Sequence, residues 1–396
     1  MERTVRGNRE YQALIGDAPE AALAGLREQA PDLYESLITG SFGGPLARAE
    51  LSRQTREMAT VAILAALGGA EGPLAAHTAA ALHNGVDTSE LLALLEHVSV
   101  YAGMPRALGA LRVVGDVLAR AQLPSPATLT TVAVGDHETV VASRGDSGPP
   151  VVLLHALGLD WRMWDAVMVG LAQSRRVFAY DIRGHGRAAG SPVPFTMDDA
   201  AADLVAVLDA LGLDRAHVVG LSYGGGIAQT AAVHHPERFA SLALLATTDF
   251  PFDAFEVRAR SGETDGMEAQ IVPSLTRWFT PAALAVDAWG VRYAREQVRR
   301  ADPRDWAAAW RSFIGLDVRG RLAGFGAPTL VLAGERDAST TPQIMSAIAQ
   351  AIDGAEYREL PGTPHMMSLE RPELVSQALS AFLPAGGAFE VSEPGR

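Results

Sequence analysis

Ser222 lies at the centre of the pentapeptide Gly-Leu-Ser-Tyr-Gly at positions 220–224. A G-x-S-x-G pattern is typical of a nucleophilic serine on a tight strand-to-helix turn, where the residues two positions before and after the serine must be small. Residues 216–219 predict the strand, and the small-residue run 226–234 predicts the helix. A glycine-rich turn with a capping serine has the same pattern, but the flanking strand and helix favour a nucleophile.

A serine hydroxyl needs a general base, and the base needs a carboxylate to orient it. Asp337 follows the apolar run 329–333, and open α/β sheets place site residues just past the C-terminal ends of buried strands. His365 is the only histidine after Asp337. We therefore predict Ser222 as nucleophile, Asp337 as acid and His365 as base. Asp249, which follows the preceding predicted strand, is the alternative acid.

Main-chain N–H groups near Ser222 could stabilise a developing oxyanion. The run 150–154 predicts another buried strand, and the loop after it contains His155 and Leu157. We expect the N–H groups of Leu157 and Tyr223 to form the oxyanion hole. His155 is expected to shape this loop, and the charged residues of 180–186 are expected to form an internal structural pair.

The elements that would position these residues begin near residue 130. A hairpin is expected at about 131–143, with its turn at Gly135-Asp136, and alternating strands and helices follow as far as 384. Helical, tryptophan-bearing sequence interrupts this alternation at about 249–317. This insertion predicts a cap over the site.

The first part of the chain, 1–123, predicts a separate all-α domain. No segment in it has a convincing strand pattern, and glycine or proline separates four alanine- and leucine-rich helices, expected at 53–67, 71–84, 88–101 and 104–120. Residues 124–129 are expected to link the two domains, so the second domain spans 130–384. The tail 385–396 is expected to be disordered.

Composition excludes several classes of function. The net charge of −13 argues against nucleic acid and anionic membranes as partners. The chain has no cysteine, which excludes disulfides, thiol redox chemistry and thiolate metal sites. No metal-ligand spacing or phosphate-binding loop implies a metal or cofactor. The N-terminus has no apolar leader and no run approaches the ~18 apolar residues of a membrane span, so a cytoplasmic protein is expected.

The ordered motifs resemble the α/β-hydrolase family over about 132–383, and within it the 3-oxoadipate enol-lactone hydrolases. Two stretches carry the closer likeness, 157–165 and 276–281. The resemblance implies a lactone substrate in a capped pocket, bordered by Trp164 and Trp278. Arg162 is the candidate clamp for a substrate carboxylate, because guanidinium binds carboxylate through two hydrogen bonds. A solvated surface arginine is the alternative.

The helical half resembles the carboxymuconolactone decarboxylase family in four stretches, 52–57, 75–77, 81–86 and 97–105. Dedicated decarboxylases of this family usually carry a glutamate four residues before the motif histidine, here His77. Pro73 stands at that position, and Glu71 is the candidate substitute. The same fold hosts proteins that work through a C-x-x-C pair, which this chain lacks.

Helical periodicity predicts two polar stripes in this half. His77 and Asn84, seven residues apart, share one helix face, and His97 and Tyr101, four apart, share another. We expect a common polar pocket, in which a histidine could hold a carboxylate or deliver a proton. Two core histidines hydrogen-bonded to the backbone are the alternative.

The two resemblances imply a two-domain fusion that acts on small carboxylated lactones. By resemblance, the hydrolase half is expected to open 3-oxoadipate enol-lactone, and the helical half to perform, or to descend from a domain that performed, the preceding decarboxylation of 4-carboxymuconolactone in aromatic degradation. The alternative is a serine esterase or lactonase of secondary metabolism whose helical domain is a non-catalytic oligomerisation module. Alanine-rich helix surface predicts a homo-oligomer in either case.

Overall fold

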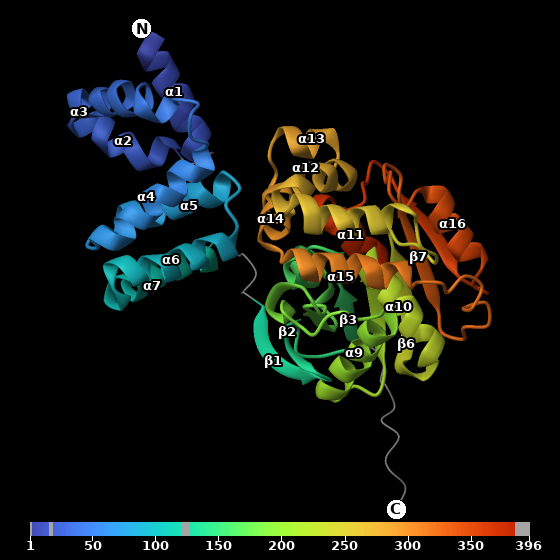
Figure 1. Cartoon of the computed structure of the whole chain (residues 1–396). Helices are drawn as coiled ribbons and strands as arrows, with labels where there is room; N and C mark the ends of the chain where they lie inside the picture. The colour runs from blue at the N-terminus through green and yellow to red at the C-terminus, as the bar shows by residue number, and fades with distance from the viewer. Residues whose placement is uncertain (1, 16–18, 121–126, 385–396) are drawn as a thin grey trace, which may run out of the picture. The chain divides into compact units, whose positions relative to one another are not determined.

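The computed structural model describes residues 2–15, 19–120 and 127–384, and Figure 1 follows the chain through them. The chain divides into two compact units, Met1–Pro126 and Ala127–Arg396. The predicted linker lies outside the described residues as far as 126, and the predicted tail 385–396 lies wholly outside them.

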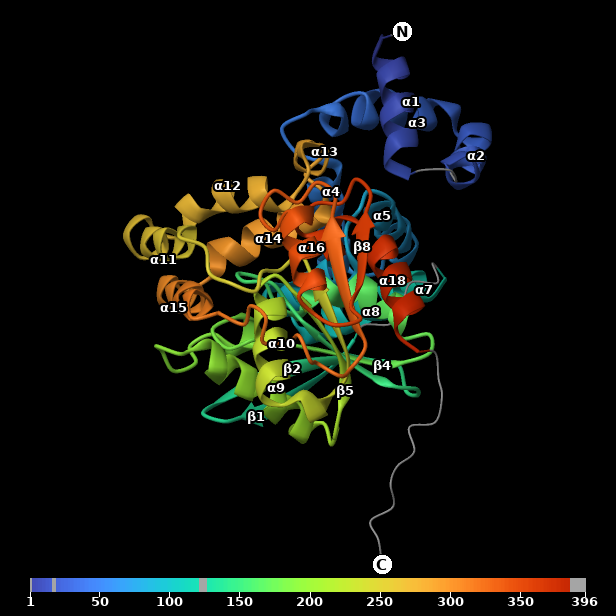
Figure 2. The same ribbon diagram turned by 90° about the vertical axis from the view of Figure 1, so that its right-hand side faces the viewer.

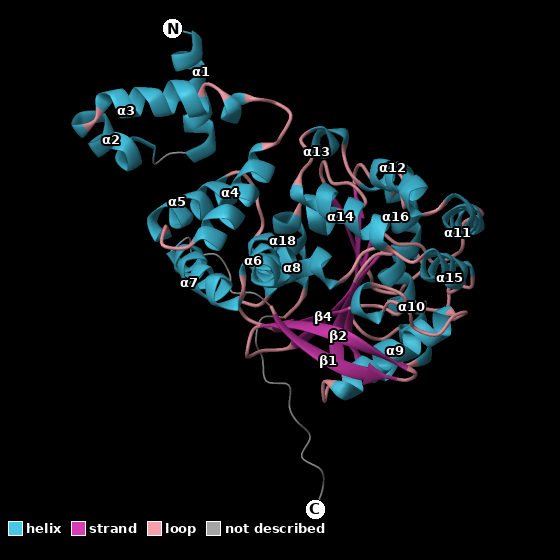
Figure 3. Ribbon diagram, turned by 60° about the vertical axis from the view of Figure 1, so that its left-hand side comes forward, coloured by secondary structure: helices cyan, strands magenta, loops and turns pink. Residues whose placement is uncertain are grey.

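The first unit is helical throughout its described residues, as predicted (Figure 3). A π-helical turn at Leu37–Phe42 and a 3-10 turn at Pro45–Ala47 follow α3. The four predicted helices are α4 to α7, each within one residue of its expected bounds. The α-helices of this unit are α1 (Glu2–Ile15), α2 (Pro19–Gln29), α3 (Pro31–Ser36), α4 (Arg53–Leu67), α5 (Glu71–His83), α6 (Thr88–Ala102) and α7 (Met104–Arg120).

Local sequence sets the ends of these helices. Asp87 and Glu90 form a capping box at the start of α6, in which the Glu90 carboxylate accepts the Asp87 N–H at 2.9 Å. The Ser52 hydroxyl caps α4 by accepting the Thr55 N–H at 3.1 Å. Gly103, with φ 87°, ends α6 in a conformation that favours glycine. Leucine, valine and alanine side chains of α4 to α7 form the core of this part.

The second unit is built on an eight-stranded mixed sheet of order β1-β2-β4-β3-β5-β6-β7-β8. The two edge pairings β1–β2 and β2–β4 are antiparallel, and all later pairings are parallel. The predicted hairpin is β1–β2. The strands are β1 (Thr128–Val134), β2 (His137–Arg144), β3 (Pro150–Leu154), β4 (Arg176–Tyr180), β5 (Ala216–Leu221), β6 (Phe239–Leu245), β7 (Thr329–Gly334) and β8 (Glu356–Leu360).

Helices cover both faces of this sheet, which is why β3, β5 and β7 are apolar and buried along their whole length. Figure 2 shows α8 and α18 on one side and α9 and α10 on the other, and each pair packs together. The helices outside the cap are α8 (Asp165–Leu171), α9 (Met197–Ala210), α10 (Tyr223–His234), α16 (Pro342–Gln350), α17 (Met367–Glu370) and α18 (Pro372–Phe382).

Five helices between β6 and β7 form the cap, in the segment where helical sequence was expected. The Val318 N–H donates to the Asp249 carbonyl at 3.1 Å and closes the base of this insertion. The cap helices are α11 (Ala254–Asp265), α12 (Met267–Trp278), α13 (Pro281–Ala285), α14 (Trp289–Arg300) and α15 (Pro303–Ile314). No helix among the described residues is long and apolar enough to cross a bilayer.

The charged residues after β4 pair differently from the expectation of an ion pair within 180–186. Arg183 binds the carboxylate of Asp203 on α9 at 2.6 Å. Asp181 instead accepts the main-chain N–H groups of Trp161 at 3.0 Å and Arg187 at 2.7 Å. Burial and the nearby charge of Asp160 raise the pKa of Asp181 to about 7. The Asp181 carboxylate therefore ties the loop after β3 to the loop after β4.

Candidate active site

Ser222 occupies the sharp turn between β5 and α10, with φ 55° and ψ −114°. A non-glycine residue in this region is strained, and such strain is concentrated at functional sites. A Cβ on Gly220 would lie 2.3 Å from the Gly224 oxygen, and one on Gly224 would lie 2.4 Å from the Leu154 oxygen. Both flanking positions therefore need glycine.

A chain of hydrogen bonds joins the three predicted residues. His365 Nε2 lies 3.0 Å from Ser222 Oγ, and His365 Nδ1 lies 2.8 Å from Asp337 Oδ2. Asp337 follows β7 and His365 follows β8, so neighbouring parallel strands deliver both side chains to one edge of the sheet. Asp249, the alternative acid, is not the hydrogen-bond partner of His365.

The surroundings of Asp337 keep its carboxylate ionised and fixed. Burial opposes ionisation, but the electrostatic interaction with His365 and hydrogen bonds from His365 and Thr340 together lower the pKa of Asp337. The Ser339 and Thr340 N–H groups donate to Oδ1 at 2.7 and 3.0 Å, and the Thr340 hydroxyl donates to Oδ2 at 2.7 Å. The anion can therefore hold the His365 imidazole in the tautomer whose Nε2 accepts a proton.

The predicted oxyanion donors lie beside Ser222. Tyr223 is the first residue of α10, where main-chain N–H groups have no acceptor within the helix. Leu157 lines the cavity over Ser222, and the Gly224 N–H donates to the His155 carbonyl at 3.1 Å, which holds the two segments together. His155 has the expected shaping role, because its Nε2 accepts the Ile182 N–H at 2.9 Å.

Aromatic and polar side chains of the cap and the core enclose a cavity of about 30 Å³ over Ser222. Trp278 lines it as predicted, and its carbonyl accepts the Met366 N–H at 3.0 Å, next to His365. The lining residues are Leu157, Ser222, Thr248, Phe252, Phe255, Arg258, Arg277, Trp278, Trp310, Phe313, Ser339, Thr340, His365 and Met366.

Two arginines that line this cavity, Arg258 and Arg277, were not among the site residues predicted from the sequence. The Arg258 guanidinium lies over the Trp310 ring, with Cζ 4.9 Å from its centroid. Burial lowers the pKa of Arg258, and burial together with the charge of Arg258 lowers that of Arg277 to about 10. Among the described residues, neither guanidinium forms an ion pair with a carboxylate. The cavity therefore holds two uncompensated positive charges.

Helical spacing was the signal that could have identified both arginines. Arg258 follows the buried Phe255 by three residues, and Arg277 follows the buried Ser274 by three. Residues three apart share a helix face, so each arginine lies on the inward face of its cap helix. A cation on such a face is costly unless it is paired or meets a ligand.

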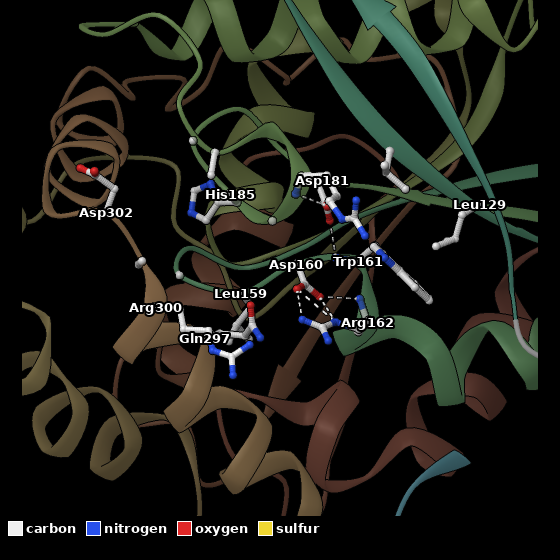
Figure 4. A pocket seen from close by; sticks show the side chains of 17 residues that line it. Leu129, Leu159, Asp160, Trp161, Arg162, Asp181, His185, Gln297, Arg300 and Asp302 are labelled. Atoms are coloured by element: carbon white, nitrogen blue, oxygen red, sulfur yellow. Dashed lines mark hydrogen bonds and ion pairs between the residues drawn. The ribbon is translucent and has the colours of Figure 1, made fainter. Parts of the chain in front are cut away.

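Arg162 and Trp164 do not line this cavity, contrary to prediction. The Arg162 guanidinium binds the Asp160 carboxylate, with Nη2 2.6 Å from Oδ2, and lines a different cavity of about 370 Å³ (Figure 4). Trp164 is fully buried in the core of the hydrolase unit. Because the Arg162 guanidinium is already paired with the carboxylate of Asp160, two residues earlier, it is not free to bind a substrate carboxylate.

The helical unit contains a buried carboxylate paired with His77, and it is Glu57 rather than the candidate Glu71. His77 Nδ1 on α5 lies 2.8 Å from Glu57 Oε2 on α4, and Glu57 is 2% exposed. Glu71 is exposed in the first turn of α5 and takes no part. Glu57 precedes the buried Val61 by four residues, so the two share a helix face. A glutamate on this apolar face could have indicated a buried partner from the sequence.

The structure does not form the predicted pocket between the two polar stripes. His97 and Tyr101 are exposed on α6, where their rings lie 4.9 Å apart, and Tyr101 is 80% exposed. The Asn84 amide donates to the Leu14 and Ala80 carbonyls at 2.7 and 2.8 Å. Within one chain, Glu57–His77 and His97–Tyr101 are therefore separate features.

Comparison with known proteins assigns both units. Residues 149–372 match the model of the alpha/beta hydrolase fold, and residues 31–116 match the carboxymuconolactone decarboxylase family. The hydrolase unit is 28% identical to 3-oxoadipate enol-lactonase 1 of Acinetobacter baylyi, over 63% of this chain and 94% of that protein. It is 29% identical to a putative carbamate hydrolase of Azorhizobium caulinodans, over 63% of this chain and 96% of that protein.

A solved structure agrees with this assignment. The enol-lactonase from Burkholderia xenovorans superposes with a TM-score of 0.62 at 29% identity, covering 64% of this chain and 99% of that one. The relatives therefore correspond to the second unit, and the helical unit is additional to them.

Proposed function

The chain belongs to the alpha/beta hydrolase fold family, and we propose that its second unit opens a carboxylate-bearing enol-lactone, 3-oxoadipate enol-lactone, by serine catalysis. The observation that carries this proposal is the hydrogen-bonded Ser222–His365–Asp337 chain in one cavity with Arg258 and Arg277. The likeness to enol-lactonases of Acinetobacter and Burkholderia supports the same substrate.

In the acylation step, Ser222 Oγ attacks the lactone carbonyl carbon while its proton passes to His365 Nε2, 3.0 Å away. The carbonyl oxygen becomes an oxyanion that the N–H groups of Leu157 and Tyr223 receive. The ring C–O bond then breaks, and His365 returns the proton to the leaving enol oxygen. Asp337 stays ionised throughout and stabilises the imidazolium.

In the deacylation step, His365 takes a proton from water, and the hydroxide attacks the acyl carbon. The bond to Ser222 Oγ breaks and the serine recovers its proton. One water is consumed for each lactone, and the enol product tautomerises to 3-oxoadipate.

Arg258 and Arg277 would bind the substrate carboxylate that does not react. A carboxylate accepts paired hydrogen bonds from guanidinium, and these are stronger in a buried site than in water. The anion would also offset the burial and the charge of Arg258, which together lower the pKa of Arg277. A neutral ester gains neither effect, so the arginine pair favours anionic substrates.

The test compares 3-oxoadipate enol-lactone with its methyl ester under identical conditions. We expect kcat/KM for the acid to exceed that for the ester by at least about tenfold, the value of one charge-assisted hydrogen bond. Equal values for the two would refute recognition of the carboxylate. No turnover of either lactone would refute the lactonase assignment.

For the helical unit, we propose a carboxy-lyase activity centred on His77, supported by the buried Glu57–His77 pair. In 4-carboxymuconolactone the bond to the carboxylate carbon would break, CO₂ would leave and an acid would protonate the ring. His77 is 30% exposed on its side chain, so it can both meet solvent and exchange a proton with Glu57. Release of CO₂ by the intact chain, lost in His77→Ala, tests this proposal.

The competing proposal is an esterase or lactonase whose helical unit serves only for self-association. It is supported by exposed apolar side chains on α6 and α7, namely Val100, Tyr101, Met104 and Leu108. It predicts ester or lactone hydrolysis with no CO₂ release from 4-carboxymuconolactone. Following CO₂ and 3-oxoadipate in one reaction separates the two proposals.

A further inference from the structure

The loop after β3 borders two cavities. Leu157, whose N–H is the proposed oxyanion donor, lines the small cavity over Ser222. The next three residues, 158–160, line the cavity of about 370 Å³ shown in Figure 4. On that side the loop faces a cavity, so its position depends on a few specific contacts with its neighbours.

One of these contacts comes from Tyr293 on cap helix α14. The Tyr293 hydroxyl donates to Asp160 Oδ1 at 2.8 Å and accepts the Asp160 N–H at 3.1 Å. Tyr293 is 7% exposed and Asp160 is 3% exposed. One buried hydroxyl therefore fixes both the main chain and the side chain of the residue that ends the loop.

Two further side chains hold the Asp160 carboxylate in place. Arg162 donates to it from Nη2 at 2.6 Å, and Figure 4 shows these bonds as dashed lines. The Gln297 amide, also on α14, lies beside both groups, and with its nitrogen turned toward Asp160 it donates to Oδ2 at 3.0 Å and accepts from Arg162 Nη2 at 2.8 Å. Arg162 Cζ lies 5.4 Å from the Tyr293 ring centroid. The cluster thus spans the core and the cap.

The cap touches the same loop at Gly158. This residue has φ 79°, and a Cβ there would lie 2.6 Å from the Trp306 ring on α15. Two cap helices, α14 and α15, therefore contact the two ends of the segment 158–160, which directly follows Leu157.

We infer that Tyr293 is a positioning residue, which holds Asp160 and through it sets the oxyanion-binding geometry at Leu157. The inference rests on the proposed function, because it assumes that Ser222 is an activated nucleophile. Oxyanion donors act only when they are placed within hydrogen-bonding distance of the oxygen that becomes charged. Because Tyr293 attaches Asp160 to the cap, the position of the Leu157 N–H relative to Ser222 depends on the position of the cap.

The test uses the intact chain with Tyr293→Phe, which removes the hydroxyl and keeps the ring. Its readout is the rate at which a fluorophosphonate labels Ser222. In that reaction a P–O bond forms to Oγ, the P–F bond breaks, fluoride leaves and the serine proton passes to His365. The phosphoryl oxygen occupies the oxyanion hole, so the rate reports its geometry without any natural substrate.

We expect Tyr293→Phe to label at least about tenfold more slowly, a part of what loss of a whole oxyanion donor costs. With an accepted lactone or ester, kcat should fall by a similar factor while KM changes less than twofold. Tyr357→Phe is the matched control, since its hydroxyl donates to the Pro342 carbonyl at 3.2 Å on another part of the sheet. That variant should label at the wild-type rate.

Asp160→Asn provides a second route to the same contact. It should slow labelling as Tyr293→Phe does, and the double variant should be slowed by less than the product of the two single effects, because both changes disturb the contact between Tyr293 and Asp160. A wild-type rate in Tyr293→Phe, or fully multiplicative effects in the double variant, would overturn the inference. Rapid wild-type labelling without lactone turnover would refute only the proposed substrate.

Discussion

The guanidinium of Arg258 lies over the indole of Trp310, with Cζ 4.9 Å from the ring centroid, inside the cavity that contains Ser222. The aromatic face stabilises the cation without neutralising it, since a ring has no formal charge. The guanidinium therefore keeps its capacity to bind an anion. Arg277, on the neighbouring helix α12, adds a second cation to the same cavity.

Arg277→Gln should raise KM for 3-oxoadipate enol-lactone roughly tenfold or more, because a charge-assisted hydrogen bond to the carboxylate is lost. Steady-state kinetics with the acid and its methyl ester measure the effect. The ester should be almost unaffected. Arg260→Gln, which removes an exposed arginine paired with Glu256 on the same cap, is the control and should leave both KM values unchanged. An equal rise for acid and ester would contradict the anion-binding role.

Ser222→Ala and His365→Ala should each lower kcat by about 10⁴-fold or more, because nucleophile and base act as a unit. The double variant should be no worse than either single variant. Circular dichroism and thermal unfolding should stay close to wild type, since neither side chain fills the core. Near-normal turnover in His365→Ala would disprove its assignment as base.

Asp337→Asn should lower kcat by about 10⁴-fold, because the amide no longer enforces the tautomer in which His365 Nε2 accepts a proton. Asp249→Asn should have a small effect, since Asp249 is not bonded to His365. The opposite ranking of the two variants in the same kinetic assay would move the acid to the loop after β6.

The contribution of His155 to the stability of the hydrolase unit should fall as pH drops from about 6.5 toward 3, while Asp181, whose pKa is raised to about 7, contributes in the opposite direction. Burial lowers the pKa of His155 to about 3, so between these values the unfolded chain binds a proton that the folded chain does not. The His155 contribution to the free energy of unfolding therefore rises with pH in this window, by up to about 1.4 kcal/mol per unit. In urea unfolding, the free energy at pH 7 minus that at pH 5 should be lower in His155→Gln than in wild type. An unchanged difference would contradict this account.

Self-association through the helical unit should weaken when its exposed apolar face is charged. Leu108 on α7 is 58% exposed, and Leu108→Glu should shift the intact chain to a smaller species in size-exclusion chromatography with light scattering. Leu129→Glu, an exposed leucine of β1, is the control and should leave the species unchanged. If the wild-type chain is already a monomer in this measurement, the proposed self-association is wrong.

The sequence predicted most of the fold because its signals were local. Capping residues such as Asp87, glycine at Gly220 and Gly224, and apolar runs at β3, β5 and β7 each determine nearby backbone, so these strands and the bounds of α4 to α7 could be predicted from them. Chain order alone identified Ser222, Asp337 and His365 as a set, and the structure brings them together.

Partners that depend on tertiary packing were harder to predict. Arg162 was predicted to bind a substrate carboxylate because guanidinium binds carboxylate through two hydrogen bonds. In the folded loop, however, the Arg162 guanidinium is paired with the Asp160 carboxylate. Glu57 meets His77 across two helices, whereas the sequence-near Glu71 stays exposed. Arg258 and Arg277 reach the site only because the cap folds over it. In each case packing between elements, rather than local preference, determines the partner.

The cavity over Ser222 measures about 30 Å³, room for a water or two and far too small for a lactone. We expect substrate binding to require an outward movement of the cap, and the apparent affinity would then be reduced by the fraction of molecules in which the cap is open. A substitution that loosens the cap should admit substrate faster and yet slow the chemical step. A looser cap thus favours substrate entry and disfavours the chemical step. Turnover should be fastest when the cap opens often and each opening is short.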